Sequence, residues 1–346
     1  MTPPLRLDRK GVGLGSVAVF VLLVGVYVGS GGLRWFDAAL APYLFGTLLA
    51  VFATVYRYVV WLRRPPTARL NQRGWQALRA KGKFGSNLVA LAGLVISNLA
   101  LQRFIAARSR ARWVAHQLIF WGCILAALVT FPLTFGWFHF ESADATGRTY
   151  LAYLGPIATI SFDSRSLVGW LVFHVLNIAA VLVIAGVTIF LIRRFRDRGA
   201  LALERAGDFA ALAGLFAVSV TGLMLTASSL WMEGRFYSFL NNLHALTVIL
   251  GLLYIPFGKL FHILQRPANL GVAFYKQAGA DSGPQICAEC GEGFASRLQM
   301  ADLKEVLPEV GFDYGLPDGG NYQDICPRCR RLLVGRAQTR RVGGFG

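Results

Sequence analysis

Charged residues are scarce in this sequence, and acidic residues are the scarcer kind. Of 346 residues only 15% are charged, and 35 Lys or Arg stand against 18 Asp or Glu, a net charge of +17. In a soluble protein that excess would suggest a nucleic-acid partner. Yet 55% of the residues are hydrophobic and 13% are aromatic, and the mean hydropathy is +0.50. This composition excludes a disordered chain and a single soluble globule, and it indicates a chain that lies largely in lipid.

Several other patterns are missing. The sequence has no internal repeat and no low-complexity tract. The glycines near the N-terminus make no dinucleotide-binding fingerprint, because they open an apolar run and follow no strand. That run is preceded by Arg6, Arg9 and Lys10 and contains no small-residue cleavage site. We therefore expect a retained helix and not a signal peptide.

Six hydrophobic runs are long enough to cross a bilayer, whose hydrocarbon of roughly 30 Å needs about 20 helical residues. A seventh run, residues 86–101, is shorter and leads into arginines at 103–112. Counting it as a span would put these arginines on the opposite side from the basic segment 63–83, so residues 86–112 are expected to form an interfacial helix. The six expected spans are 12–32, 39–62, 114–138, 168–192, 208–230 and 239–264.

The distribution of charge orients these spans. If both termini are cytoplasmic, the outer loops contain four basic and five acidic residues, which leaves 31 of the 35 basic and 13 of the 18 acidic residues on the other side. Short cytoplasmic loops are enriched in Lys and Arg. The sequence thus predicts a multi-pass protein of the inner (cytoplasmic) membrane with both termini in the cytoplasm.

Two of the five histidines, His244 and His262, lie on the last expected span, 18 residues apart. On one continuous helix this is almost five turns, which places both rings on one face about 27 Å apart along the axis. Histidine inside a bilayer is costly unless it is bonded. Two ligands on one face at two depths are what a helix needs to hold two stacked haems, so we expect two haem b groups.

Each haem iron needs a second axial ligand from a neighbouring helix at a matching depth. His116, at the cytoplasmic start of the third span, is level with His262, and His174, inside the outer end of the fourth span, is level with His244. His139 is the alternative to His174, although it lies at the outer mouth of its helix and is shallower. A hydrogen-bonded core residue stays open as the other interpretation of His174.

The residues around these histidines resemble a known family. The stretch from Leu243 to Ile263, with its two histidines and its Tyr-Ile-Pro-Phe step, is similar to the last helix of the membrane cytochrome b (gamma) subunit of respiratory nitrate reductase. The stretch from Arg112 to Gly122 resembles the related cytochrome b subunits of sulfite-reductase-linked and heterodisulfide-reductase complexes. The resemblance covers roughly residues 45–265.

This resemblance implies a five-helix dihaem core that exchanges electrons between quinol and a cytoplasmic iron–sulfur partner. Three ligand positions match directly, namely His116, His244 and His262. The family's fourth ligand stands ten residues after the first, where this sequence has Ala126. Either His174 replaces it from another helix, or the outer haem is absent or differently bound. The first span and the C-terminal tail lie outside the family pattern.

Four of the five cysteines form two Cys-x2-Cys pairs in the tail, Cys287 with Cys290 and Cys326 with Cys329. On the reducing side of a membrane such pairs indicate a thiolate metal site and not disulfides. Each pair puts two sulfurs on one tight turn, and two pairs complete a tetrahedron. Zinc is the expected metal, with rubredoxin-like iron or an iron–sulfur cluster as alternatives. Cys123, inside the third span, is expected to be a small buried hydrophobe.

Between the cysteine pairs, residues 299–307 are predicted to form a short amphipathic helix that Pro308 ends. From Arg266 onwards the tail has 10 basic and 9 acidic residues, which gives a nucleic-acid partner little electrostatic support. The arginines between 328 and 341 fit anionic membrane lipid or an acidic partner, or they are simply solvated. We expect the tail to dock the cytoplasmic subunits.

The predicted fold class is an all-α integral membrane protein, a six-helix transmembrane bundle with a small cytoplasmic tail in which four cysteines bind a metal. Residues 1–38 are expected to contain an extra N-terminal transmembrane helix, 39–265 a dihaem cytochrome b-like domain, and 266–346 the metal-binding tail.

The predicted function is electron transfer between the quinone/quinol pool and the cytoplasmic iron–sulfur and catalytic subunits of a respiratory oxidoreductase complex. Within the outer loop, Glu141, Asp144 and Tyr153 are among the polar residues expected nearest to the outer haem. The alternative functions are a membrane transporter, or a redox or metal sensor, with a zinc-ribbon regulatory tail. Few polar residues other than the histidines interrupt the spans, which disfavours a transport path.

Overall fold

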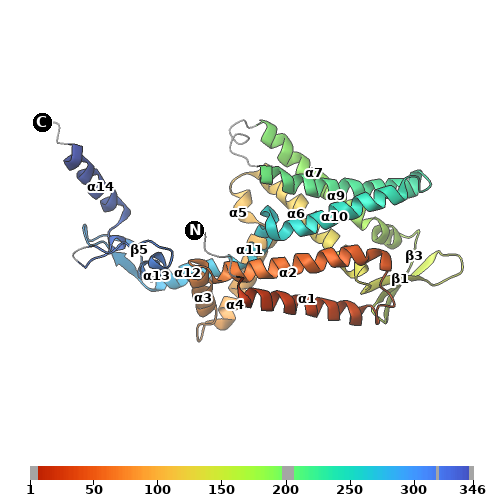
Figure 1. The fold of residues 1–346 in the computed structure, drawn as a ribbon, viewed down its shortest axis with the longest axis horizontal. Helices are drawn as coiled ribbons and strands as arrows, with labels where there is room; N and C mark the ends of the chain where they lie inside the picture. The colour runs from red at the N-terminus through yellow and green to blue at the C-terminus, as the bar shows by residue number, and fades with distance from the viewer. Residues whose placement is uncertain (1–6, 197–205, 317–318, 343–346) are drawn as a thin grey trace. The chain divides into compact units, whose positions relative to one another are not determined.

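The computed structural model describes residues 7–196, 206–316 and 319–342, and 72% of these residues are helical. Among the described residues, six helices are long and apolar enough to cross a membrane (Figure 1). They confirm the expectation of a multi-pass membrane protein. The ends of these helices differ by a few residues from the ends of the apolar runs. They are α1 (Arg9–Gly29), α2 (Ala41–Arg63), α6 (Arg110–Thr134), α7 (Leu167–Arg196), α9 (Ala206–Trp231) and α10 (Tyr237–Phe257).

Polar caps explain why two of these helices begin before their apolar runs. The carboxylate of Asp8 accepts a hydrogen bond from the backbone N–H of Gly11 at 2.8 Å, and the hydroxyl of Ser109 accepts one from the backbone N–H of Arg112 at 3.4 Å. These side chains satisfy amide groups that have no partner inside the helix. As a result α1 and α6 both begin among charged residues.

Small residues bring α6 and α7 close together. A Cβ on Gly186 of α7 would lie 2.6 Å from the carbonyl oxygen of Ala115, and one on Gly122 of α6 would lie 2.9 Å from that of Ala179. Ala115 and Ala179 are themselves buried. Helices in lipid associate through such close backbone approach, because burial of apolar surface gives little gain there.

A three-stranded antiparallel sheet connects α6 to α7 (Figure 1), in the order β1 (Phe138–Ser142), β2 (Thr149–Leu154) and β3 (Ile157–Asp163). The expectation of an entirely helical fold was wrong for this segment. The segment is rich in serine, threonine and charged residues, a composition that indicates a loop. Phe138 and Phe140 alternate along β1 and point to the same side. The Phe140 ring packs against Phe138, Phe162 and Phe173, and these rings form the packed face of the sheet.

The last expected span is not one helix. The α10 helix ends at Phe257, Gly258 has an extended backbone (φ −99°, ψ −166°), a 3-10 turn follows at Lys259–Phe261, and α11 begins at His262 and runs to Ala268. Pro256 has no N–H for the helix, and a side chain on Gly258 would clash with the ring of Tyr254. His244 and His262 therefore lie on different helices, and the prediction that they share one helix face was wrong.

The chain forms two compact units. The first comprises residues 1–59 and 96–264 and contains the six long helices and the sheet, apart from the last residues of α2. The second joins residues 60–95 to the tail, 265–346. Its elements are α3 (Thr67–Leu78), α4 (Phe84–Leu94), α12 (Gly271–Asp281), β4 (Pro284–Ile286), β5 (Gly293–Ser296), α13 (Arg297–Glu309) and α14 (Pro327–Val342).

The helix predicted for residues 299–307 is confirmed as part of α13. Its start is set by Ser296, whose hydroxyl accepts a hydrogen bond from the backbone N–H of Gln299 at 3.2 Å. Pro308 lies in the last turn, and the helix ends one residue later at Glu309. The α4 helix continues through a π-helical turn, Val95–Ala100, and the apolar helix Phe84–Ala100 is too short to count among the spans, as expected.

The close contact of α6 with α7 predicts the effect of adding one methyl group. Gly186→Ala is expected to destabilise the protein by about 1–3 kcal/mol through overpacking against backbone atoms. Gly214→Ala in α9 is the control, because nothing lies within 4 Å of its added Cβ and alanine is the better helix former. Thermal unfolding of the two detergent-solubilised variants measures the difference. An unchanged melting temperature in Gly186→Ala would contradict this account of the contact.

Candidate functional site

The four tail cysteines come together in the second unit. The sulfurs of Cys287, Cys290, Cys326 and Cys329 all lie within 4.8 Å of one another, and those of Cys290 and Cys326 are 3.8 Å apart. Four thiolates around one zinc ion, with Zn–S bonds near 2.3 Å, have neighbouring sulfurs about 3.8 Å apart. All four are free thiols. The prediction is confirmed to the extent that this cluster can bind one metal ion.

Local backbone structure positions these sulfurs. Gly291, directly after the first pair, has φ +73°, a conformation that glycine adopts without strain, and its N–H donates to the carbonyl of Cys287 at 3.0 Å. The second pair begins α14, with Pro327 as the first helical residue, where its missing N–H costs nothing. Each pair thus folds as the tight turn that its spacing predicts.

Backbone N–H groups also point at the sulfurs. The N–H of Cys326 donates to the sulfur of Cys287 at 3.2 Å, and the N–H of Cys329 donates to that of Cys326 at 3.4 Å. Burial raises the pKa of the Cys287 thiol, but hydrogen bonds from backbone N–H groups, that of Cys326 foremost, outweigh this and lower the pKa to about 6. The thiolate that a metal requires is therefore favoured at this sulfur.

The histidines of the first unit separate into one close pair and three other sites. The ring centroids of His116 on α6 and His262 on α11 are 6.5 Å apart, with the ring planes at 75°. Two imidazoles that ligate one iron from opposite sides have centroids about 6 Å apart, because each metal–nitrogen bond is about 2 Å and each nitrogen lies about 1 Å from its ring centre. The structure brings these two predicted ligands close together, at a centroid spacing compatible with one shared metal ion.

One ring nitrogen of this histidine pair is held by a backbone carbonyl, and an arginine lies nearby in the sequence. The Nδ1–H of His262 donates to the carbonyl of Lys259 at 2.6 Å, which leaves Nε2 as the metal-binding nitrogen. Arg112 lies one helical turn before His116 on the same side of α6. Its Nε is buried and makes no hydrogen bond to any described residue. Arg112 as a whole is half-buried, and its unpaired Nε–H suits an anionic ligand.

A second arginine stabilises the helix break next to the pair. Arg57 of α2 donates a hydrogen bond to the carbonyl of Pro256, and its guanidinium lies 4.2 Å from the ring centroid of Phe261. Because α10 ends at Phe257, that carbonyl has no partner from a continuing helix. Arg57 therefore supports the backbone turn that delivers His262.

His244 is fixed by the neighbouring helix α9. Its Nδ1 lies 2.9 Å from the hydroxyl of Thr221. That hydroxyl donates its own proton to the carbonyl of Ala217 at 2.7 Å, so the Nδ1–H of His244 is the donor and Nε2 remains for a ligand. The ring also rests on Gly222, whose added Cβ would lie 3.4 Å from Cε1. His244 is thus oriented as metal-ligating histidines are.

The two predicted partners of His244 have other neighbours. On α7 the Nδ1–H of His174 donates to the carbonyl of Trp170 at 2.9 Å, and its ring stacks on the Trp170 ring with centroids 4.7 Å apart. No ring contact joins His174 or His139 to His244 in the part of the chain that the structure describes. The close contact therefore involves one predicted histidine pair and not the other.

His139 lies on β1 between two aromatic rings. The centroids of Trp35 and Tyr153 are 4.7 Å and 5.0 Å from that of the imidazole, and both rings are nearly parallel to it. Burial lowers the pKa of His139, and the carboxylate of Glu141, whose Oε1 is 3.8 Å from Nε2, offsets part of that effect. Rings cover both faces of this imidazole, as in a packed core residue.

The charged residues between α6 and α7 stabilise the sheet. The carboxylate of Asp144 accepts hydrogen bonds from the backbone N–H groups of Arg148 and Thr149 at 3.0 and 2.8 Å, and the Nε–H of Arg148 donates to Asp163 at 2.8 Å. Hydrogen bonds to Asp144 from neighbouring side chains and from the N–H of Arg148 lower the pKa of its carboxyl group. The group is therefore ionised in the hairpin turn. These residues have structural partners and are not assigned to a quinone.

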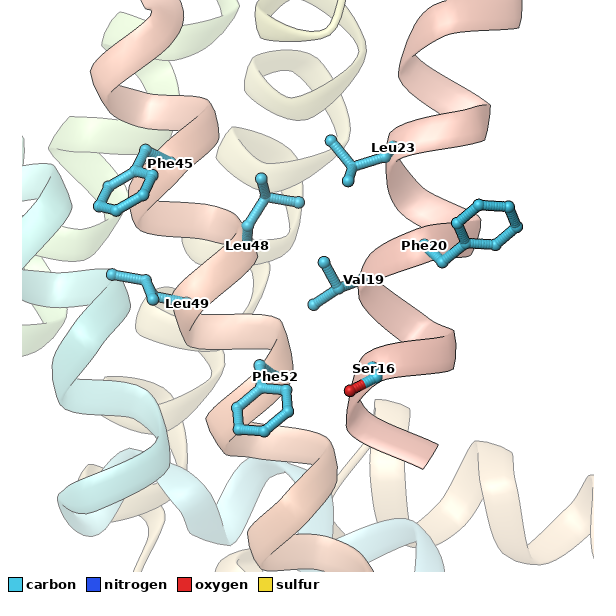
Figure 2. A pocket seen from close by; sticks show the side chains of 8 residues that line it. All are labelled: Ser16, Val19, Phe20, Leu23, Phe45, Leu48, Leu49 and Phe52. Atoms are coloured by element: carbon cyan, nitrogen blue, oxygen red, sulfur yellow. The ribbon is translucent and has the colours of Figure 1, made fainter. Parts of the chain in front are cut away.

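An apolar groove lies between α1 and α2 (Figure 2). Val19 and Leu23 point from α1 towards Leu48 of α2 across a space of about 330 Å³. Ser16 is the one polar residue among the eight that line it, so the groove offers no metal ligand and no charged group. It suits a hydrocarbon chain, and we assign no chemistry to it.

Two residues beside the histidines were missed from the sequence, although one had a readable signal. Arg112 stands four residues before His116, a spacing that puts both on one side of a helix. Thr221 had no signal, because only the packing of α9 on α10 brings it to His244.

No protein-family model, curated protein sequence or solved structure matches this chain. Its function is therefore inferred from the chemistry of these residues.

The cysteine cluster predicts metal binding that depends on the tail sulfurs alone. Cys326→Ser is expected to weaken metal binding by more than about tenfold, because a hydroxyl is a poor substitute for a thiolate. Cys123→Ser, which changes the cysteine outside the cluster, is expected to retain the metal. Elemental analysis of both purified full-length variants measures the bound zinc and iron. Equal metal content in the two variants would exclude this cluster as the site.

Proposed function

We propose that this protein is a haem b membrane subunit that transfers electrons between the quinone/quinol pool and the cytoplasmic iron–sulfur and catalytic subunits of a respiratory oxidoreductase complex. The observation that carries this proposal is the contact between His116 and His262, whose centroid separation of 6.5 Å fits two axial ligands of one iron. The likeness of their flanking sequences to the cytochrome b subunits of nitrate reductase and related complexes supports the same assignment.

Each residue around this pair has a role that follows from its chemistry. His116 and His262 would hold the haem iron, the Lys259 carbonyl fixes the ring orientation of His262, and Arg112 would pair with a carboxylate of the haem. A haem bound here supplies a one-electron carrier within the bilayer. The bond from Nδ1 to the Lys259 carbonyl would make Nε2 of His262 a stronger ligand, and the charge of Arg112 would favour the reduced state of a bound haem over that beside a neutral residue.

His244 is proposed as one ligand of a second haem. The hydrogen bond to Thr221 orients its ring, and Gly222 leaves space beside it. His174 is the proposed partner, with His139 as its alternative. Of the two, His174 has the more suitable chemistry, since its Nδ1–H is bonded to a helix carbonyl and Nε2 is left for a ligand.

The cysteine cluster is proposed as a zinc site that holds the tail in the shape needed to dock the partner subunits. The cluster is surrounded by a small core in which Ile325 is buried and Phe294 and Leu333 are packed against it. A core of this size has little stability of its own, so metal binding is expected to supply most of it. Iron in place of zinc would make the tail an electron carrier instead.

The histidine pair predicts specific losses of haem. His116→Ala and His262→Ala are each expected to remove the same haem, about half of the total if two are bound, because iron loses an axial ligand in both. Reduced-minus-oxidised spectra with haem quantitation on the purified proteins measure this. His174→Ala is expected to remove the other half, and His139→Ala none. The absence of any b-type signal in the unaltered protein would overturn the proposal and favour a transporter or a sensor.

Arg112 predicts a change in potential without a loss of haem. Arg112→Gln is expected to lower the midpoint potential of the haem held by His116 by roughly 40 mV, which corresponds to about 1 kcal/mol of lost charge stabilisation. Arg110→Gln removes the same charge from an exposed position on the same helix and is the matched control. A redox titration followed by optical spectra measures both. Equal shifts in the two variants would remove Arg112 from the haem site.

A further inference from the structure

The connection between α2 and α6 has the charge of a membrane-binding segment. The α2 helix ends at Arg63 and α6 begins at Arg110, so both ends of the connection emerge from membrane-crossing helices. It contains no acidic residue, and basic segments of this kind are attracted to anionic lipid. Its basic residues are Arg64, Arg69, Arg73, Arg79, Lys81, Lys83, Arg103 and Arg108.

One side of α3 in this connection is used within the second unit. Arg73 binds the buried carboxylate of Asp302 on α13 at 2.9 Å, and Arg69 lies 3.8 Å from the same carboxylate. On the same side Gly74 approaches α12 so closely that an added Cβ would lie 3.0 Å from the carbonyl oxygen of Gly271. These contacts account for two of the arginines and tie α3 to the module that holds the cysteines.

The other side of α3 is open. Gln72, Trp75, Gln76 and Arg79 line a shallow depression of about 440 Å³. The Trp75 side chain is 50% exposed, and the guanidinium of Arg79 lies 5.0 Å from its ring centroid. An exposed tryptophan beside an arginine is typical of the headgroup layer, where the ring meets both apolar and polar surroundings.

The next helix, α4, exposes an apolar face. Phe84, Leu88 and Val95 follow one another at helical spacing and are 53%, 47% and 39% exposed, and Val89 is 75% exposed. Beside this face the buried Asn87 donates hydrogen bonds to the carbonyls of Ala77 and Leu78 at 2.9 and 3.2 Å. That amide joins α4 to the end of α3, so the two helices form one hairpin.

We propose that the α3–α4 hairpin (67–94) lies in the plane of the membrane surface and binds anionic phospholipid, with Trp75 and Arg79 at the headgroup and the apolar face of α4 against acyl chains. Lipid is favoured over a protein partner because both ends of the connection emerge from membrane-crossing helices, its charge is all positive, and the apolar face is too short to span. This surface is independent of the proposed haem and metal sites.

Fluorescence quenching of the full-length protein tests this placement. The protein is reconstituted in vesicles of phosphatidylcholine and phosphatidylglycerol, with and without brominated phosphatidylcholine, beside the Trp75→Phe variant. The difference in emission between the two proteins isolates Trp75, and bromine is expected to quench this difference by at least about twofold. If Trp75 is quenched by aqueous iodide and not by brominated lipid, the face is open to water and available to a protein partner, and the proposal is wrong.

A second measurement tests the headgroup site even if Trp75→Phe does not fold. Arg79→Gln is expected to weaken phosphatidylglycerol binding to the detergent-solubilised full-length protein about fivefold, the effect of one arginine at a membrane surface. Arg336→Gln, which removes an exposed charge on α14 of the same unit, is expected to leave it unchanged. Equal effects of the two substitutions would mean that net charge alone attracts the lipid. The proposed headgroup site at Arg79 would then be wrong.

Discussion

A polar group in the hydrocarbon layer must have a partner, and this requirement shapes the first unit. The Nδ1–H groups of His174, His244 and His262 all donate to oxygen atoms of the protein, and Arg57 satisfies the carbonyl freed where α10 ends. These bonds leave Nε2 of each of the three imidazoles for a ligand. The same requirement makes the buried Nε of Arg112 informative, because this atom has no hydrogen bond to a described residue and an anionic group bound there would accept one.

The second unit combines two ways of holding a small module in place. The cysteine cluster has too small a core to fold without help, and four sulfurs within 4.8 Å of one another provide a place for a metal ion. The buried carboxylate of Asp302 is paired with arginines of α3, and the two helices of the α3–α4 hairpin are joined by Asn87. The cysteine cluster, the ion pair and the hairpin therefore all belong to this unit, whose open face is the proposed lipid surface.

Hydropathy and local spacing account for what was predicted correctly. Six spans could be read from the sequence because a length of apolar residues is almost sufficient for a membrane helix, and the cysteine turns could be read because both sulfurs of a pair lie on one short loop. The sheet between α6 and α7 was missed because its strands are half-exposed and pair through contacts that are set by the fold. The break before His262 had its signals, Pro256 and Gly258, but a proline is also tolerated within a membrane helix.

The sequence by itself determined the membrane character of the protein, the number of its apolar spans and the identity of four sulfurs that can bind a metal, because these depend on composition and on neighbours within one turn. Only the tertiary structure decided which histidines meet. His116 and His262 are brought together by the end of α10 and the turn that Arg57 supports, whereas His244 is directed by a threonine of another helix. Contacts between distant helices depend on side-chain packing and on where a helix ends, and neither follows from the spacing of histidines along the chain.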